Sequence, residues 1–204
     1  MNIVVKTSAG KYIVRPDTTR AKDCSDFFPP EFVDRISYTP VLFARICKPG
    51  RSIGEEFSDR YYDAVGYGIL LYPQDMLDGS EAGFACASFL PLPLFDKDSL
   101  GEGKREGGGE GEKGGEKGGE GDAFRLRVKK EAKTAKQVFS YSGGTTRMIE
   151  RAIAEATRFV LLRAGDLLAI ELGRRRPLCR RSDTDVAVAA SYGGTLTMDF
   201  RIRY

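Results

Sequence analysis

Two long apolar segments in the first half of the chain constrain its fold more than any other feature. Residues 36–47 read ISYTPVLFARIC, and residues 64–72 form a second apolar segment that ends at Pro73. Continuous apolar runs of this kind are typical of β-strands that lie in a core. Pro40 interrupts the first run and cannot donate a hydrogen bond to a β-ladder, so it predicts an edge strand or a bulge.

The chain next to these strands is predicted to bring aromatic side chains into the core. Residues 54–62 have the pattern of one short helix, with Phe57 and Tyr61 directed inward. Residues 19–35 are predicted to be irregular. Their aromatic side chains are expected to fill the core beneath a loop, with a binding platform as the alternative: Phe27, Phe28 and Phe32.

Hairpin signals mark both ends of the chain. At the start, the runs NIVVKT and KYIVR flank Ser8-Ala9-Gly10, a triplet that can supply the positive φ of a tight turn. At the end, DVAVAASY and TLTMDFRIRY alternate between apolar and polar residues and are joined by Gly193-Gly194. Further extended segments are predicted over residues 82–95, 124–128 and 167–172.

One segment carries a clear helical pattern. The turn Gly143-Gly144-Thr145-Thr146 precedes it, and a threonine at this place can cap the helix N-terminus. An anion bound at the same N-terminus is the alternative to a plain cap. Apolar residues then recur at spacings of three and four, which predicts a stripe facing the core: Met148, Ile149, Ala152, Ile153, Ala156 and Phe159. One principal helix among many strands gives a predicted fold class of α+β, mainly β.

A low-complexity segment interrupts the pattern of strands. Residues 101–122 hold 11 of the 24 glycines, seven acidic and four basic side chains, and no large apolar residue. Such a segment cannot bury enough apolar surface to offset the entropy of ordering. We therefore assign residues 97–123 to a disordered Gly/Glu/Lys-rich insertion. It would lie within a single domain of residues 1–204, because a chain that is 41% hydrophobic can form one sizeable core.

The composition excludes several classes of function. The chain has no histidine, which excludes Ser-His and Cys-His nucleophiles and histidine metal sites. Its net charge of +3 is too small to indicate a nucleic-acid partner. The four cysteines are scattered without a C-x-x-C pair, which indicates reduced thiols. No segment has the length of a membrane span or the pattern of a signal peptide, so no membrane partner is expected and the predicted localisation is cytoplasmic.

Five sequence blocks follow one another in a recognisable order. They are Arg15-Pro16-Asp17-Thr18, SYTPVLFARICKPGRSI, EEFSDRYYDAVGYGI, TTRMIERAI and RAGDLL, and together they reach over most of the chain outside the insertion. This ordered set resembles the fumarylacetoacetate hydrolase family. The resemblance implies a mixed β-roll and a homodimer. It also implies a family chemistry in which Mg²⁺ or Mn²⁺ supports the cleavage, isomerisation or decarboxylation of oxo-acids such as acylpyruvates.

The resemblance also implies three metal-binding carboxylates, and this chain lacks all of them. In the family, two come from a His-Tyr-Glu-x-Glu strand and the third from the Asp of a Gly-Ile-Asp strand end. The three carboxylate positions fall on Thr39, Val41 and Leu70, and the leading His falls on Ser37. Hard divalent cations need oxygen ligands, which valine and leucine side chains do not have.

Other site motifs of the family are altered as well. Its Lys-x-Phe-Asp motif falls on Ala87, Phe89 and Leu90, so the Lys and the Asp are missing. Its Gly-Thr-Pro stretch, which helps to hold the substrate, is replaced by IELGRRRP. The chain is also expected to begin after the family's Ile-Gly-Arg-Asn-Tyr opening strand and the catalytic lid that follows it.

These departures favour a catalytically degenerate relative with a structural or partner-binding role, with no catalytic residue and no cofactor. The alternative is an active hydrolase or isomerase of acylpyruvate-type oxo-acids, with Mg²⁺ or Mn²⁺ bound by substitute carboxylates, so the assignment as an enzyme stays open. The candidate carboxylates are Asp63, Asp75, Asp78 and Glu81. Surface solvation and turn capping are the structural interpretation of the same side chains.

A run of arginines supports a third hypothesis, the metal-free binding of an anionic ligand or an acidic protein partner. Five arginines occur within eight residues: Arg174, Arg175, Arg176, Arg180 and Arg181. Guanidinium groups bind carboxylates and phosphates through two parallel hydrogen bonds, which makes such a run a candidate anion clamp. A solvated loop is the alternative.

Overall fold

The computed structural model describes residues 1–21, 25–74, 87–92, 94–100, 123–130 and 134–204. The strands of the larger sheet are β1 (Asn2–Lys6), β2 (Tyr12–Pro16), β3 (Arg35–Ile46), β4 (Tyr62–Pro73), β5 (Ser88–Phe89), β6 (Phe95–Asp96), β9 (Leu167–Glu171) and β10 (Arg176–Arg180). The strands of the smaller sheet are β7 (Phe124–Lys130), β8 (Lys136–Tyr141), β11 (Asp185–Tyr192) and β12 (Thr195–Arg203). The helices of the described chain are η1 (Asp17–Thr19), η2 (Glu55–Tyr61), η3 (Lys97–Ser99) and α1 (Thr146–Ala156).

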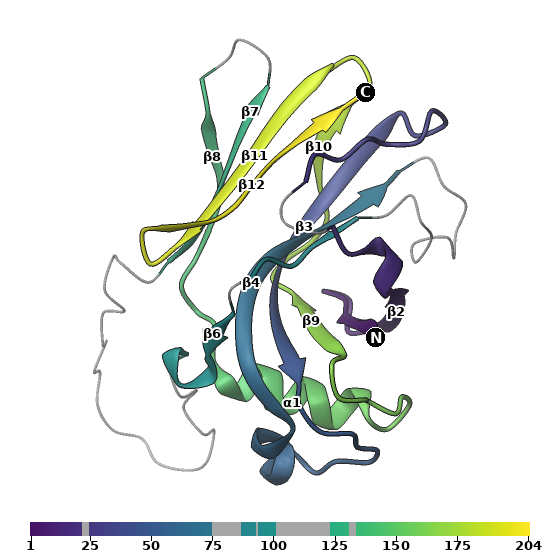
Figure 1. Ribbon diagram of the computed structural model, residues 1–204, viewed down its shortest axis with the longest axis vertical. Helices are drawn as coiled ribbons and strands as arrows, with labels where there is room; N and C mark the ends of the chain where they lie inside the picture. The colour runs from purple at the N-terminus through teal and green to yellow at the C-terminus, as the bar shows by residue number, and fades with distance from the viewer. Residues whose placement is uncertain (22–24, 75–86, 93, 101–122, 131–133) are drawn as a thin grey trace.

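The larger sheet is mixed and curled, and the other elements are arranged around it. Its strands follow the order β2-β1-β9-β3-β4-β5, with β10 paired to β3 and β6 paired to β4. The smaller sheet, in the order β12-β11-β7-β8, stands at one end of the molecule, and α1 lies at the opposite end (Figure 1). The hairpin of β1 and β2 joins the larger sheet through a parallel pairing of β1 with β9.

Pro40 lies in the middle of the larger sheet, so the predicted edge strand or bulge is wrong. On one side of β3, Pro40 is opposite Ile69 of β4 in a register that is continuous there. On the other side, β3 pairs with β10 over residues 35–38 and with β9 over residues 41–45. Pro40 falls in the gap between these two partners, so its missing N–H interrupts neither ladder. Its carbonyl oxygen accepts a hydrogen bond from the N–H of Leu172.

Both predicted hairpins and the predicted helix are confirmed. β1 and β2 pair antiparallel around a turn in which Gly10 has φ of +77°. β11 and β12 pair around Gly193 and Gly194, which have φ of +57° and +80°. The helix α1 begins after Thr145, whose hydroxyl oxygen accepts a hydrogen bond from the N–H of Met148.

Several aromatic side chains that were predicted to be buried are exposed. Phe57 is 50% exposed, because η2 is a 3₁₀ helix with three residues per turn and residues four apart do not share a face in it. Phe159 is 76% exposed, because α1 ends at Ala156. Of the three aromatics in the irregular segment, Phe27 packs edge to face against Phe89. The other two are mostly exposed: Phe28 and Phe32.

Side chains of β3 alternate between two apolar layers on opposite faces of the larger sheet. Even-numbered residues such as Leu42 and Ala44 enter a core shared with the smaller sheet and α1. Odd-numbered residues such as Val41 and Phe43 enter a layer on the other face, here called the second apolar cluster. Its buried members are Ile3, Val5, Val41, Phe43, Leu70, Tyr72, Leu90, Leu167 and Ala169. Burial on both faces explains why the sequence of β3 is continuously apolar rather than alternating.

Some sequence predictions concern residues that the structure does not describe. Residues 101–122, which make up most of the predicted insertion, lie outside the described residues, as do Cys24 and Cys86. The other two cysteines, Cys47 and Cys179, have free thiols. The single-domain assignment stays a prediction. Among the described helices, none has the length and apolar character needed to cross a bilayer.

Candidate functional site

The three positions on which the sequence resemblance placed the metal carboxylates meet on one face of the larger sheet. Thr39 on β3 is directly opposite Leu70 on β4, and Val41 lies two residues further along β3 on the same face. All three side chains are fully buried. Val41 and Leu70 belong to the second apolar cluster. The same cluster includes Leu90, on which the sequence resemblance placed the Asp of the Lys-x-Phe-Asp motif.

Gly68 allows another segment of the chain to cover these positions. It is opposite Val41 in the register of β3 and β4. A Cβ atom at residue 68 would stand 2.3 Å from the carbonyl oxygen of Phe89, so the chain leaving the edge strand β5 passes directly over Gly68. Leu90 follows and packs into the second apolar cluster. Protein atoms therefore fill the space over Val41 and Leu70.

The residues at these positions do not fit a divalent metal ion. Mg²⁺ and Mn²⁺ prefer carboxylate oxygens, and the side chains of Val41 and Leu70 contain only carbon and hydrogen. The hydroxyl oxygen of Thr39 is buried and has no hydrogen-bond partner in the described structure. One neutral oxygen cannot offset the loss of the ion's hydration shell. Within the described ranges, no three His, Cys, Asp or Glu side chains gather closely enough to hold a metal.

A hydrogen-bonded carboxylate lies on the same sheet face, one strand away. Glu171, at the end of β9, is opposite Val41, so both side chains point to the same side. One oxygen of Glu171 accepts a hydrogen bond from the Tyr72 hydroxyl at 2.6 Å, and the other accepts one from the Ser8 N–H at 2.8 Å. Burial raises the pKa of the Tyr72 phenol, which therefore stays protonated and donates. The carboxylate ties β9 both to β4 and to the turn of the first hairpin.

Two guanidinium groups pack against the ring of Tyr72. Their central carbon atoms lie 4.2 Å (Arg15) and 3.8 Å (Arg175) from the ring centroid. Arg15 is fully buried and donates hydrogen bonds to the carbonyl oxygens of Leu71 and Ala87. We call the four side chains Arg15, Tyr72, Glu171 and Arg175 the polar cluster. Because Arg15 reaches from β2 to β4, this cluster holds the first hairpin against the larger sheet.

The polar cluster borders a surface cleft, here called the hairpin cleft. This cleft has a volume of about 550 Å³ and lies between the turn of the first hairpin and the connection from β9 to β10. It is lined by Thr7, Ser8, Ala9, Lys11, Ile13, Glu171, Arg174 and Arg175. Three of these side chains are cationic and one is a carboxylate, so the lining carries a net positive charge.

The five arginines predicted to form an anion clamp do not share one site. Arg174 and Arg175 line the hairpin cleft. Arg176 donates to the carbonyl oxygen of Val138 on the smaller sheet. Arg180 is exposed at the end of β10. The loop alternative is wrong for residues 176–180, because they form this strand.

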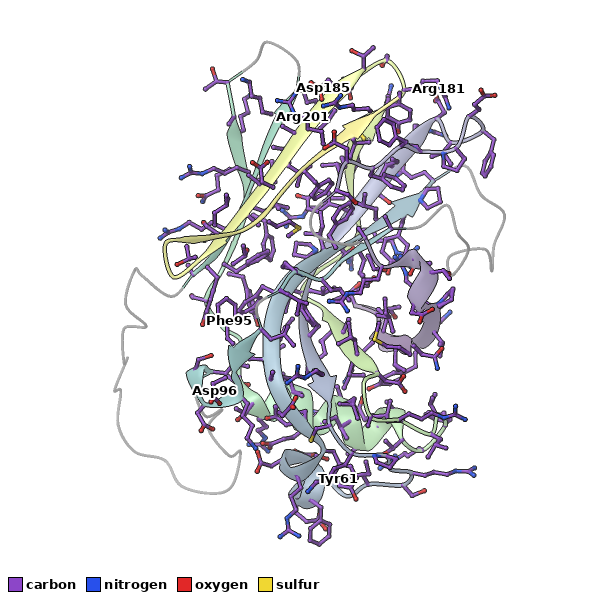
Figure 2. The ribbon with its side chains drawn as sticks, in the orientation of Figure 1. Tyr61, Phe95, Asp96, Arg181, Asp185 and Arg201 are labelled. Atoms are coloured by element: carbon purple, nitrogen blue, oxygen red, sulfur yellow. The ribbon has the colours of Figure 1, made fainter. Side chains whose placement is uncertain are left out.

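Arg181 has a structural role of its own. Its guanidinium group donates to the carbonyl oxygens of Pro30, Glu31 and Val33, and it packs over the ring of Tyr204. Figure 2 places Arg181 at the end of the molecule where the chain terminates, far from the β1–β2 hairpin in the same view. The arginine run therefore divides between a cleft and two structural contacts.

Of the proposed substitute carboxylates, the structure describes only Asp63. Its two oxygens accept hydrogen bonds from Arg45 at 2.8 and 2.9 Å, and this pairing lowers the pKa of the Asp63 carboxyl. The ion pair is exposed to solvent. The other three candidates lie outside the described residues: Asp75, Asp78 and Glu81.

Sequence reasoning missed the polar cluster, although one of its members left a signal. Glu171 is the acidic residue at the end of the apolar segment LLAIE, and a carboxylate at such a place is costly to bury unless partners satisfy it. Tyr72 and Arg15 left no comparable signal. Their partners lie far away in the sequence, and both are also ordinary residues for strand ends.

Comparison with solved structures identifies the fold. A protein of Yersinia pestis assigned to the fumarylacetoacetate hydrolase family matches with a TM-score of 0.65 at 16% identity, over 98% of this chain and 92% of that chain. A fumarylpyruvate hydrolase of Pseudomonas aeruginosa, solved with Mn²⁺ and pyruvate, matches with a TM-score of 0.61 at 12% identity, over 100% of this chain and 88% of that chain. No protein-family sequence model and no curated protein sequence matches the chain. The resemblance stated from the sequence is confirmed at the level of the fold, including its mainly β character and mixed sheet.

Proposed function

We propose that this chain, which has the fold of the fumarylacetoacetate hydrolase family, is a binding protein that works without a metal and lacks the family's hydrolase chemistry. One observation carries the proposal: the three expected metal positions are fully buried and hold one hydroxyl and two apolar side chains. Leu90, which follows β5, packs with Val41 and Leu70 in the second apolar cluster. Neither a hydrated cation nor an oxo-acid bound to it would fit without unpacking the second apolar cluster.

The remaining features of this sheet face support binding rather than catalysis. The hairpin cleft is open to solvent and lined by cations, which suits an anionic ligand or an acidic partner. No cofactor forms part of the proposal. The homodimer implied by the family resemblance is included in it, and light scattering during size-exclusion chromatography would check that state.

The alternative function is an active hydrolase or isomerase of acylpyruvate-type oxo-acids with substitute carboxylates. Two observations weigh against it. Asp63 is held by Arg45, and both oxygens of Glu171 already accept hydrogen bonds from the protein. If Glu171 gave up its partners to bind Mg²⁺ or Mn²⁺, the buried hydroxyl of Tyr72 would be left without an acceptor.

Calorimetric titration with Mn²⁺, followed by a hydrolysis screen over acylpyruvates and related oxo-acids, tests the proposal. We expect no stoichiometric binding in the micromolar range and no turnover. A fumarylpyruvate hydrolase assayed in parallel shows that the screen detects activity. Stoichiometric binding with micromolar affinity, or metal-dependent turnover, would overturn the proposal. If turnover occurs, a variant with alanine at both Asp63 and Asp75 tests whether these two carboxylates support it.

A further inference from the structure

The hairpin cleft carries positive charge that its described neighbours leave unpaired. Within the described chain, the side-chain nitrogens of Lys11 and Arg174 form no hydrogen bond or ion pair. The carboxylate in the cleft, Glu171, already accepts hydrogen bonds from Tyr72 and Ser8. Two cations that line one concave surface and form no ion pair with its single carboxylate attract an anion from solution.

The walls of the cleft are held in place by contacts on both sides. The N–H of Ser8 donates to Glu171, which ties the hairpin turn to the end of β9. The guanidinium of Arg175 lies over the ring of Tyr72, and Arg15 packs against the same ring. The walls of the cleft therefore exist before a ligand binds, and only the side chains of Lys11 and Arg174 need to be ordered by it.

The shape and lining of the cleft favour a small ligand over a protein surface. A volume of about 550 Å³ is in the range of small-molecule sites. Besides its charges, the cleft presents the apolar side chains of Ala9 and Ile13 and the hydroxyl group of Ser8. These groups suit a ligand with an oxyanion at one end and a short carbon skeleton.

We infer that the hairpin cleft binds a small organic oxyanion, held by Lys11 and the guanidinium fork of Arg174 without a metal ion. This inference rests on the metal-independent function proposed above. Arg174 contributes two parallel hydrogen bonds to a carboxylate or phosphate, and Lys11 contributes a point charge. The cleft thus gives the proposed binding function a ligand class, carboxylates or phosphate esters of small size.

Calorimetry in buffer freed of metal by a chelating resin tests the inference. The probes are pyruvate, succinate and inorganic phosphate, with acetamide as an uncharged comparison. We expect saturable binding of at least one anion at a stoichiometry of one, and none of acetamide. Binding of carboxylates alone or of phosphate alone supports the site and tells which oxyanion it takes.

Charge-removing variants locate the bound anion. Arg174→Gln and Lys11→Gln should each raise the dissociation constant at least tenfold, and Arg174→Lys should raise it less than Arg174→Gln. Arg158→Gln is the matched control, because Arg158 is an exposed arginine in a different cleft beside α1 and its replacement removes the same charge. The control should bind within twofold of the unaltered protein. Circular dichroism of each variant verifies folding.

The outcomes separate this inference from the function on which it rests. Affinity equal to that of the unaltered protein in both Gln variants, or no saturable binding of any anion, would overturn the cleft as an oxyanion site. If the Mn²⁺ titration is silent at the same time, the metal-independent function still stands. Anion binding that occurs only after Mn²⁺ is added would overturn both.

Discussion

Val41 and Glu171 are opposite each other on neighbouring strands of one sheet face, yet their surroundings differ completely. Val41 is enclosed by the second apolar cluster, which includes Leu90 from the segment after β5. The carboxylate of Glu171 lies at the hairpin turn. Its two oxygens accept hydrogen bonds from the N–H of Ser8 and the hydroxyl of Tyr72. The comparison shows that a carboxylate on this face depends on hydrogen-bond donors supplied by other segments. Glu171 has such donors, whereas the apolar surroundings of Val41 offer none.

Val41→Glu is the strongest way to break this comparison. A carboxylate at residue 41 would be buried without partners, so we expect a loss of about 4 kcal/mol or more in the free energy of unfolding. Urea denaturation followed by circular dichroism measures the loss. Val41→Thr is the control of matched shape, with an expected loss of about 1–3 kcal/mol for one unsatisfied hydroxyl. A Val41→Glu variant with unaltered stability, or one that Mn²⁺ stabilises, would contradict the close apolar packing of the second apolar cluster around Val41.

Glu171→Gln tests the polar side of the comparison with a smaller expected effect. The amide keeps the shape of the carboxylate but offers one acceptor oxygen, so either Ser8 or Tyr72 loses its acceptor. We expect a loss of about 1–3 kcal/mol, since hydrogen bonds to charged groups lie in this range. A double-mutant cycle with Tyr72→Phe should give a coupling energy of about 0.5 kcal/mol or more between the two residues. Strict additivity of the two changes would mean that the 2.6 Å contact contributes nothing to stability.

Asp63→Asn removes a carboxylate that lies outside the surroundings of both Val41 and Glu171. We expect it to change the free energy of unfolding least of the three substitutions. The hydrogen bonds from Arg45 lower the pKa of Asp63 below its ordinary value of 3.8, so the pair stabilises the folded state at neutral pH. That contribution is complete above about pH 4 and is lost as the pH falls through the lowered pKa. Because both side chains are more than 40% exposed, solvent screening limits it to less than about 1 kcal/mol.

Denaturation of Asp63→Asn and of the unaltered protein at pH 7 and at pH 2.5, each at low and at 1 M NaCl, checks this expectation. The difference between the two proteins should shrink at low pH and at high salt. A difference that persists under both conditions would show that Asp63 has a partner beyond Arg45.

Much of the fold was predictable from the sequence, because the signals are local. The turn at Ser8-Ala9-Gly10, the cap at Thr145 and the apolar stripe of α1 each involve neighbours in the chain. The structure contains all three, except that Phe159 of the predicted stripe lies beyond the helix and is exposed. The prediction for Phe57 was wrong because residues four apart share a face in an α-helix but not in the 3₁₀ helix that forms here. The prediction for Pro40 was wrong because a strand can change partners along one edge, which its own sequence does not indicate.

The candidate site was predictable only in part. The residue types at positions 39, 41 and 70 already indicated that a metal would lack ligands, and this follows from side-chain chemistry alone. The sequence could not show that the segment after β5 packs Leu90 against Val41 and Leu70. That contact depends on the close approach of Phe89 to Gly68. The two residues are far apart in the sequence and come together only when the sheet forms.

The sequence by itself determined the identity of the strands, the position of the helix and the absence of carboxylates at positions 39, 41 and 70. Only the tertiary structure decided which charged side chains find partners in the fold. Glu171 lies 163 residues from Ser8 and 99 residues from Tyr72, and Arg15 lies 72 residues from Ala87. No local pattern encodes contacts over such separations, because they arise when a parallel pairing of β1 with β9 brings the first hairpin beside the end of β9.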